Sequence, residues 1–249
     1  KANAALTLGN LKAEEAVEHL INALEDTETN IVVSIVRALH HINDKNTVDK
    51  LIETLEDTSN TVILRRNVGA CLQLIQDQKS INALNKILAE KTEDLTLRNY
   101  ALSALTKMKA VEALDNYLNI LDDPDEDFQL KINAAAGIGL IGKSCYIPTL
   151  LTLANQTEIA DLKNNCVNAI RMLVSRSVDR CAIDDKSLLP LLKDENETIK
   201  AMAAESLGLL RSEAAVKELV KLVNNTEEKV IARLYSIEAL GTIGDKKVA

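Results

Sequence analysis

The chain has 249 residues, a formal net charge of −8 and 47% hydrophobic residues, but only 2% aromatic residues. The acidic balance argues against a nucleic-acid or anionic-membrane surface, and no apolar run approaches the roughly 18 residues that span a bilayer. With one Phe and no Trp, the core must consist of many small aliphatic contacts, which suit thin stacked layers better than one thick globule.

One three-residue motif returns along the chain and sets its period. It consists of a small residue, then Leu or Ile, then a variable residue that is often Gly. The copies in chain order are Thr7-Leu8-Gly9, Ala38-Leu39-His40, Cys71-Leu72-Gln73, Ala104-Leu105-Thr106, Gly137-Ile138-Gly139, Ala169-Ile170-Arg171, Ser206-Leu207-Gly208 and Ala239-Leu240-Gly241. Their mean spacing of about 33 residues indicates a repeat architecture.

Two further columns of residues share this register. Eight residues after the motif, an apolar pattern with a period of 3.6 begins at Val17, Val48, Ile81, Leu114, Ile147 and Val216, which predicts an amphipathic helix. Eight residues before the last motif position stand Lys1, Val32, Arg65, Arg98, Lys131, Lys163, Lys200 and Arg233, a basic column broken only at Val32. The motif itself lies on a second helix.

Polar turns separate the two helices of each unit. They include Glu25-Asp26-Thr27, Glu56-Asp57-Thr58-Ser59-Asn60, Asp122-Asp123-Pro124-Asp125 and Lys193-Asp194-Glu195-Asn196, residue types that cap helix N-termini. Each unit is therefore predicted to be helix, turn, helix. Because one unit cannot bury its apolar faces alone, neighbouring units must stack into a continuous core.

The residues of the later units resemble the HEAT repeat, in the variety named after phycobilisome lyases. The resemblance rests on Ile199-Lys200, Ala203 to Gly208, Ala215-Val216 and Leu219, and again on Leu130-Lys131, Ala134-Ala135, Ile138 to Gly142 and Ile147-Pro148. It implies an all-α, right-handed α-solenoid, an armadillo-like superhelix, of about eight HEAT-like repeats. It also implies that the basic column reaches back to acidic residues and carbonyls of the turns; a phosphate-binding row is the alternative.

We expect residues 1–249 to form a single array of such repeats. Lys1 stands in the basic column at the start of a second helix, and the chain stops with Gly244 to Ala249, just where another first helix is expected to begin. Neither end has the polar outer face usual for a terminal unit. The sequence therefore predicts a segment of a longer protein.

The family resemblance implies that the second helices line the concave face, so their variable positions are the candidate partner-binding groove. These positions hold amides, Tyr and Arg, and Tyr and Arg often carry interface energy. The candidates are Arg37, His40, Arg66, Asn67, Asn99, Tyr100, Asn133, Asn164, Asn165, Arg171 and Tyr235. A second candidate is an insertion of about six residues in the sixth unit, between Arg176 and Cys181.

Catalytic and metal-binding patterns are absent from the sequence. His40 and His41 are adjacent, so on a helix they point about 100° apart and cannot readily chelate together. The His-Glu pairs of the HEAT-repeat deoxyhypusine hydroxylases do not recur. Asp123, Asp125 and Asp127 begin like a calcium loop, but Phe128 and Ala134 stand where Gly and Glu are required.

The four cysteines show no metal-binding spacing. Cys71 and Cys166 lie in apolar helical runs, and we expect reduced, buried thiols of a cytoplasmic protein. Cys145 or Cys166 could act as a nucleophile only with a base, and the sequence assigns none. We therefore expect no enzyme activity, no cofactor and no metal.

The function predicted from these features is a protein-protein interaction scaffold that binds a partner protein or peptide on its concave helix face, within a larger regulatory or assembly protein. We expect a monomeric module with no nucleic-acid or membrane partner. The alternative is a bilin lyase or phycobilisome-associated factor, although 2% aromatic residues provide little to stack a large chromophore. DNA binding of the HEAT-like glycosylase kind is disfavoured by the net charge.

Overall fold

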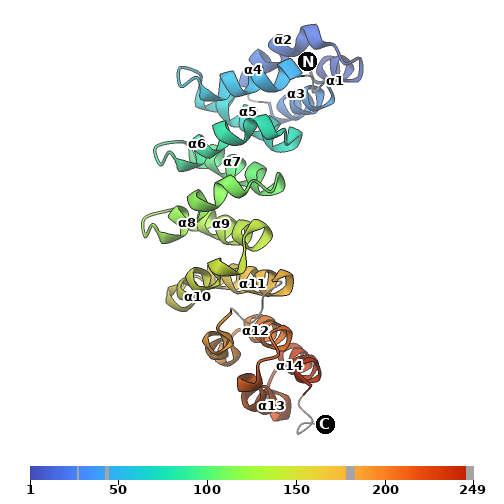
Figure 1. Ribbon diagram of the computed structural model, residues 1–249. Coiled ribbons are helices and arrows are strands. Elements are labelled where there is room, and N and C mark those ends of the chain that lie inside the picture. The colour runs from blue at the N-terminus through green and yellow to red at the C-terminus, as the bar shows by residue number, and fades with distance from the viewer. Residues whose placement is uncertain (27, 43–44, 178–182, 245–249) are drawn as a thin grey trace. The chain divides into compact units, whose positions relative to one another are not determined.

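The computed structural model describes residues 1–26, 28–42, 45–177 and 183–244, and these residues form helices and turns with no strand among them (Figure 1). The helices that carry the repeated motif, called B helices here, are α1 (Ala2–Asn10), α3 (Thr29–Ile42), α5 (Val62–Ile75), α7 (Leu95–Lys107), α9 (Phe128–Ile141), α11 (Ala160–Arg176), α12 (Glu197–Leu209) and α14 (Val230–Ile243). The expected fold class, an all-α solenoid of HEAT-like helix pairs, is confirmed.

The A helices alternate with the B helices and carry the amphipathic pattern. They are α2 (Val17–Asn22), α4 (Lys45–Glu56), α6 (Ile81–Ala89), α8 (Leu114–Asp122), α10 (Ile147–Gln156) and α13 (Val216–Asn224). Short 3-10 turns flank most of them: η1 (Glu14–Ala16), η2 (Ala23–Glu25), η3 (Gln78–Ser80), η4 (Val111–Ala113), η5 (Ser144–Tyr146) and η8 (Glu213–Ala215). Between α11 and α12 the A position is occupied by a longer 3-10 helix, η7 (Asp185–Lys193), which contains Pro190.

The chain divides into two compact units, Lys1–Asn116 and Tyr117–Ala249, which we call unit 1 and unit 2. In unit 1, α3 packs between α1 and α5, and α5 packs on α7. In unit 2, α11 packs between α9 and α12, and α12 packs on α14. Within each unit, successive B helices therefore lie side by side, with the A helices on their flank (Figure 1).

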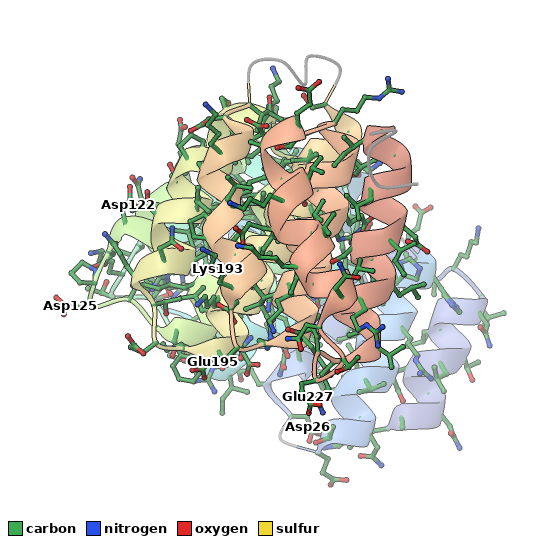
Figure 2. All side chains as sticks on the ribbon, turned by 90° about the horizontal axis from the view of Figure 1, so that it is seen from below. Asp26, Asp122, Asp125, Lys193, Glu195 and Glu227 are labelled. Atoms are coloured by element: carbon green, nitrogen blue, oxygen red, sulfur yellow. The ribbon has the colours of Figure 1, made fainter. Side chains whose placement is uncertain are left out.

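Side chains in the polar turns cap the N-termini of several B helices, as the sequence predicted. Thr61 accepts a hydrogen bond from the backbone N–H of Leu64, at 3.2 Å, at the start of α5. Asp94 and Asp127 cap α7 and α9 in the same way. These caps satisfy donors that a helix N-terminus leaves open. In unit 2, Figure 2 shows the turn carboxylates of Asp125, Glu195 and Glu227 at the ends of the helices.

Most B helices end in a left-handed residue that the motif did not reveal. Lys12, Lys109 and Arg211 each stand three positions after the motif and have φ between 52° and 55°. The next residue donates its N–H back into the helix, as Ala110 does to the carbonyl of Leu105 at 2.9 Å. These hydrogen bonds satisfy carbonyl groups at the C-terminal end of the helix, and the left-handed residue turns the chain towards the next A helix.

Small residues bring successive B helices into backbone contact. A Cβ atom added at Gly9 would lie 2.6 Å from the Cα of Ala38. The same added atom at Gly208 would lie 2.7 Å from the Cα of Ala239. The small motif residue of one helix thus packs on the last motif residue of the helix before it. Gly has no Cβ atom, and it is the residue that permits this close approach.

The basic column ties the turns to the helices. Arg65 is nearly buried; its Nε donates to the carbonyl of Leu55 at 2.8 Å, and its Nη1 and Nη2 donate to Glu93 at 3.0 and 2.6 Å. Lys163 pairs with Asp194, and Lys200 pairs with Glu228, each at 2.5 Å. The carbonyl lies behind the basic residue, as expected, but the carboxylate lies ahead, in the following turn. That part of the prediction was wrong, because the acidic turn belongs to the next helical repeat.

Candidate functional site

A groove of about 490 Å³ opens on the B helices of unit 1. Residues from α3, α5 and α7 form it, together with the turn that precedes α3. Its lining comprises Asp26, Thr29, Val32, Val33, Val36, Arg37, Ile63, Arg66, Asn67, Ala70, Leu74 and Tyr100. Four of the predicted groove residues, Arg37, Arg66, Asn67 and Tyr100, therefore line one hollow.

The walls of this groove expose aliphatic side chains to solvent. Val33 of α3 is 42% exposed, and Ile63 and Leu74 of α5 are 44% and 40% exposed. These side chains lie outside the buried core of unit 1. The core residues, for example Ile35 and Leu72, lie on the opposite side of the same helices. The groove can therefore take apolar side chains out of water.

An ion pair braces one side of the groove. The Nε of Arg66 donates to Asp94 at 2.5 Å, and its Nη2 donates to the other carboxylate oxygen. Asp94 also accepts the backbone N–H of Leu97, at 3.0 Å, as the cap of α7. The Arg66 hydrogen bond is the main reason that the pKa of Asp94 is lowered. Arg66 is thus held in place between α5 and α7.

Arg37 provides the uncommitted charge of the groove. Its side chain is exposed on α3, and among the described residues no hydrogen bond or ion pair is recorded for it. Asp26, also in the lining, accepts a hydrogen bond from Nζ of Lys1 at 2.9 Å. The guanidinium of Arg37 is therefore available to an anionic group that enters the groove.

The two remaining predicted residues of the groove have different roles. Asn67 donates from Nδ2 to the carbonyl of Leu24 at 2.7 Å, so its amide fastens α5 to the end of η2. Tyr100 is half-buried at the α7 side of the hollow. Tyrosine combines a large apolar ring with a hydroxyl, which suits a surface that is partly wet.

The other predicted residues of unit 1 lie outside this lining. His40 is half-buried near the end of α3, and its Nδ1 has no hydrogen-bond partner among the described residues. Asn99 donates to the carbonyl of Leu95, one turn back in α7, at 3.0 Å. The expected row of amides is therefore partly occupied by the backbone of its own helices.

Unit 2 holds the remaining predicted groove residues. Arg171 contacts Glu205 at 3.2 Å and Asn168, which joins α11 to α12. Three asparagines make side-chain hydrogen bonds: Asn133 accepts from Gln129, Asn164 accepts from Asn196, and Asn165 donates to the carbonyl of Asp161. Tyr235 is half-buried on α14.

The sequence did not single out the apolar residues of the groove. Val33, Val36 and Ile63 stand outside the buried stripe of their helices, and this extra apolar content was the available signal. The insertion between Arg176 and Cys181 falls mostly on residues 178–182, outside the described residues.

The described cysteines differ in burial. Cys71 and Cys166 are buried as predicted, and burial raises the pKa of both thiols, that of Cys166 to about 12. Cys145 is exposed beside a second hollow of about 420 Å³. No three His, Cys, Asp or Glu side chains in the described part of the chain group as a metal site would require.

None of the described helices combines the length and the apolar character needed to cross a bilayer.

Several solved structures are similar to this chain, and two with a TM-score of 0.50 or above show the same fold. The YibA protein of Escherichia coli aligns with a TM-score of 0.65 and 20% identity, over 97% of this chain and 86% of that chain. A structure of the CpcE–CpcF complex of phycocyanin lyase from Nostoc aligns with a TM-score of 0.50 and 18% identity, over 94% of both chains. Human deoxyhypusine hydroxylase aligns with a TM-score of 0.43 and 16% identity, over 97% and 90%. No curated protein matches the sequence.

A sequence model of HEAT repeats matches residues 1–65 and 186–249, which together make up more than half of the chain. These segments contain the first and last motifs, the Gly9–Ala38 and Gly208–Ala239 contacts, and the Lys200–Glu228 pair. The sequence and the geometry thus agree on one assignment: the chain belongs to the family of HEAT-repeat proteins.

Proposed function

We propose that this protein is a HEAT-repeat scaffold that binds a partner protein through the groove of unit 1, and that the bound element is a short peptide segment with an apolar side chain next to a carboxylate. The observation that carries the proposal is the pairing, in one hollow, of exposed aliphatic walls with the guanidinium of Arg37, which has no ion-pair partner among the described residues.

The aliphatic walls supply the affinity in this proposal. Val33, Ile63 and Leu74 are each about two-fifths exposed, so a side chain inserted between them removes apolar surface on both partners from water. Complete burial of one Leu or Phe side chain contributes roughly 1.5–3 kcal/mol. The groove volume of about 490 Å³ accommodates one or two such side chains but no folded domain.

The charge of Arg37 supplies the selectivity. Arg66 is already engaged in a two-pronged pair with Asp94, so an incoming anion would compete with an existing carboxylate there. No described carboxylate is paired with Arg37, and a guanidinium can bind a carboxylate with two parallel hydrogen bonds. A peptide with Asp or Glu near its apolar anchor therefore fits better than a basic one.

Selection from a random peptide library displayed on phage tests the proposal. We expect enriched peptides that combine an aliphatic or aromatic residue with Asp or Glu within a few positions. Fluorescence polarisation of a labelled selected peptide should then show that Arg37→Glu and Leu74→Asp each weaken binding by roughly tenfold or more.

Arg211→Glu is the matched control, because it makes the same charge change at an exposed turn residue of unit 2. It should leave the affinity unchanged apart from a small salt-dependent effect. Equal affinities of the wild-type chain and the two groove variants, or enrichment of basic peptides, would place binding elsewhere and contradict the proposal.

The bilin lyase alternative is less well supported by the groove. Tyr100 is the only aromatic residue in its lining, so a conjugated tetrapyrrole would find one ring to contact. Mixing the protein with a bilin and an apo-phycobiliprotein separates the two functions. A new covalent visible absorbance would favour the alternative, whereas its absence together with the selected peptide motif would favour peptide binding.

The remaining parts of the proposal follow from the scaffold role. We propose that the protein acts as a monomeric, non-catalytic module. The free thiols of Cys71 and Cys166 support a place in a reducing compartment such as the cytoplasm.

A further inference from the structure

The basic column is interrupted at Val32, and the groove of unit 1 opens at that interruption. Arg65 and Arg98, the column residues of the next two B helices, are buried, with 6% and 4% of their surface exposed. Each donates its Nε to the carbonyl of the second-last residue of the preceding A helix, Leu55 at 2.8 Å and Leu88 at 3.2 Å. Val32 is shorter, carries no charge and has no side-chain donor.

The carbonyl that corresponds to those of Leu55 and Leu88 has a different donor at the interruption. Leu24 is the second-last residue of η2, and its carbonyl accepts a hydrogen bond from Nδ2 of Asn67 at 2.7 Å. The hydroxyl of Thr61 donates to Glu25 at 3.3 Å. Helix α5 and its capping residue therefore hold the end of η2 directly, and contacts within the protein frame the groove.

The acidic partner of the column is also replaced at the interruption. Arg65 binds Glu93, which stands 28 residues after it. The residue 28 positions after Val32 is Asn60, whose Nδ2 donates to the carbonyl of Thr54 at 3.0 Å. Neither charge of the Arg65 pair therefore has an equivalent in the sequence at this place. The interruption exchanges a buried ion pair for aliphatic surface.

The aliphatic residues around Val32 form one end of the groove. Val32 and Val36 are half-buried at its floor, and Val33 and Ile63 are exposed at its walls; we call these four residues the Val32 hollow. Arg37 follows Val32 by five residues on α3, which is about 7.5 Å along the helix axis. An extended peptide advances about 3.3 Å per residue. A side chain on Val32 and a carboxylate on Arg37 therefore belong to peptide residues two positions apart.

We propose that the Val32 hollow receives the apolar side chain of the bound peptide, and that Val32 is the residue that selects its size. The partner segment inserts an aliphatic or aromatic side chain onto Val32 and carries Asp or Glu two positions away, which binds Arg37. Val32 takes this role within the peptide-binding function proposed above, on which the proposal rests.

An arginine or lysine from the partner fits the hollow less well. The carbonyl of Leu24 already accepts the amide of Asn67. Asp26, the carboxylate in the groove lining, already pairs with Nζ of Lys1 at 2.9 Å. A charged side chain that leaves water without a free partner loses more free energy than an apolar one. The hollow therefore favours an apolar side chain over a basic one.

The double variant Val32→Arg with Asn60→Glu supplies both members of the column pair and tests the proposal. Fluorescence polarisation of a phage-selected acidic peptide with the full chain should show affinity weakened by roughly tenfold or more. Val32→Arg alone should weaken it as well, although its added positive charge attracts the peptide at long range. The opposite signs of the steric and the charge effects make this single variant informative. Binding that both variants leave unchanged or tighter would overturn the proposal.

Val111→Arg is the matched control. It makes the same change at a residue of unit 1 that is 59% exposed and lies outside the groove lining. Its affinity should equal that of the wild type apart from a small salt-dependent effect.

Val32→Ala tests the selection of size without adding charge or bulk, and it decides the matter if the double variant is unfolded by circular dichroism. The enlarged floor should raise the affinity for a Phe-containing peptide relative to its Leu counterpart by roughly threefold or more. The same ratio in the variant and the wild type would contradict the role of Val32. Equal affinity for peptides whose carboxylate lies five or more positions from the apolar residue would also contradict it.

These outcomes separate the Val32 proposal from the peptide-binding function itself. Peptides whose affinity depends on Arg37 and Leu74 but not on Val32 would overturn the Val32 proposal and leave peptide binding in the groove standing. A selection that yields no peptide dependent on Arg37 would overturn both.

Discussion

Two glycines in the same register should differ in how their replacement by alanine changes the stability of the fold. Gly208 and Gly241 both occupy the last motif position near the C-terminal end of a B helix. A Cβ atom added at Gly208 would lie 2.7 Å from the Cα and 2.9 Å from the Cβ of Ala239. The same atom at Gly241 would meet nothing within 4 Å among the residues that the structure describes. The pair therefore separates helix propensity from helix packing.

The magnitude follows from two terms. Replacing Gly by Ala in a helix gains up to about 1 kcal/mol of stability. The gain should be similar at Gly208 and Gly241, because both residues lie in the last turn of their helices. At Gly208 the added methyl presses on backbone that cannot move alone, and such overpacking costs about 1–3 kcal/mol. We expect Gly241→Ala to be neutral or stabilising by up to about 1 kcal/mol, and Gly208→Ala to be less stable than Gly241→Ala by about 1–3 kcal/mol.

Urea-induced unfolding monitored by far-ultraviolet circular dichroism measures the difference. Gly69→Ala provides an intermediate case, because its added atom would meet the terminal Cδ1 of Leu97 at 2.7 Å, and a side chain yields more easily than backbone. Equal shifts of the unfolding midpoint for Gly208→Ala and Gly241→Ala would refute the reasoning, since they would show that the α12–α14 contact does not resist a methyl group.

Three further predictions concern the core, the ion pairs and the thiols. Leu207→Ala, at a fully buried motif position, should lower the free energy of unfolding by about 2–5 kcal/mol in the same urea assay. Lys200 lowers the pKa of Glu228, so this pair stabilises the fold at neutral pH, and its contribution should be lost as the pH falls below about 4.3; stability against pH, compared with Lys200→Met, measures it. In the native protein, a thiol reagent should modify Cys145 long before Cys166, as mass spectrometry can follow.

Each of these predictions has a control. Leu11→Ala, at a residue that is 72% exposed, should change stability by less than about 0.5 kcal/mol. Parallel stability curves for the wild type and Lys200→Met between pH 7 and about 3 would contradict the assigned ion pair. For the thiols, Cys181→Ser removes a residue outside the described structure, and urea should make Cys71 and Cys166 as reactive as Cys145.

Much of the fold could be predicted because the same motif, with the same packing requirements, occurs eight times in the sequence. The motif at Gly9, Gly208 and their equivalents marks helix contacts, and the amphipathic pattern marks the A helices. A single sequence could not show the direction of the ion pairs. Arg65 could in principle reach either neighbouring turn, and only the stacking of helical repeats places Glu93 against it.

The candidate site was predicted in part. Variable positions on the B helices led to Arg37, Arg66, Asn67 and Tyr100, which do line one groove. The sequence could not show that Arg66 is held by Asp94 whereas Arg37 has no partner in the described parts of the chain, because that difference depends on which turn each helix faces. It also could not show that the side-chain amide of Asn67 donates a hydrogen bond to the carbonyl of Leu24.

Hydrogen exchange of the full chain with a saturating, phage-selected peptide tests the central claim most directly. The account predicts slower exchange in residues 29–42 and 62–75, the helices α3 and α5 that form the groove, with residues 128–141 of α9 unchanged. Protection confined to unit 2, or no protection at saturation, would contradict a peptide-binding groove at Arg37.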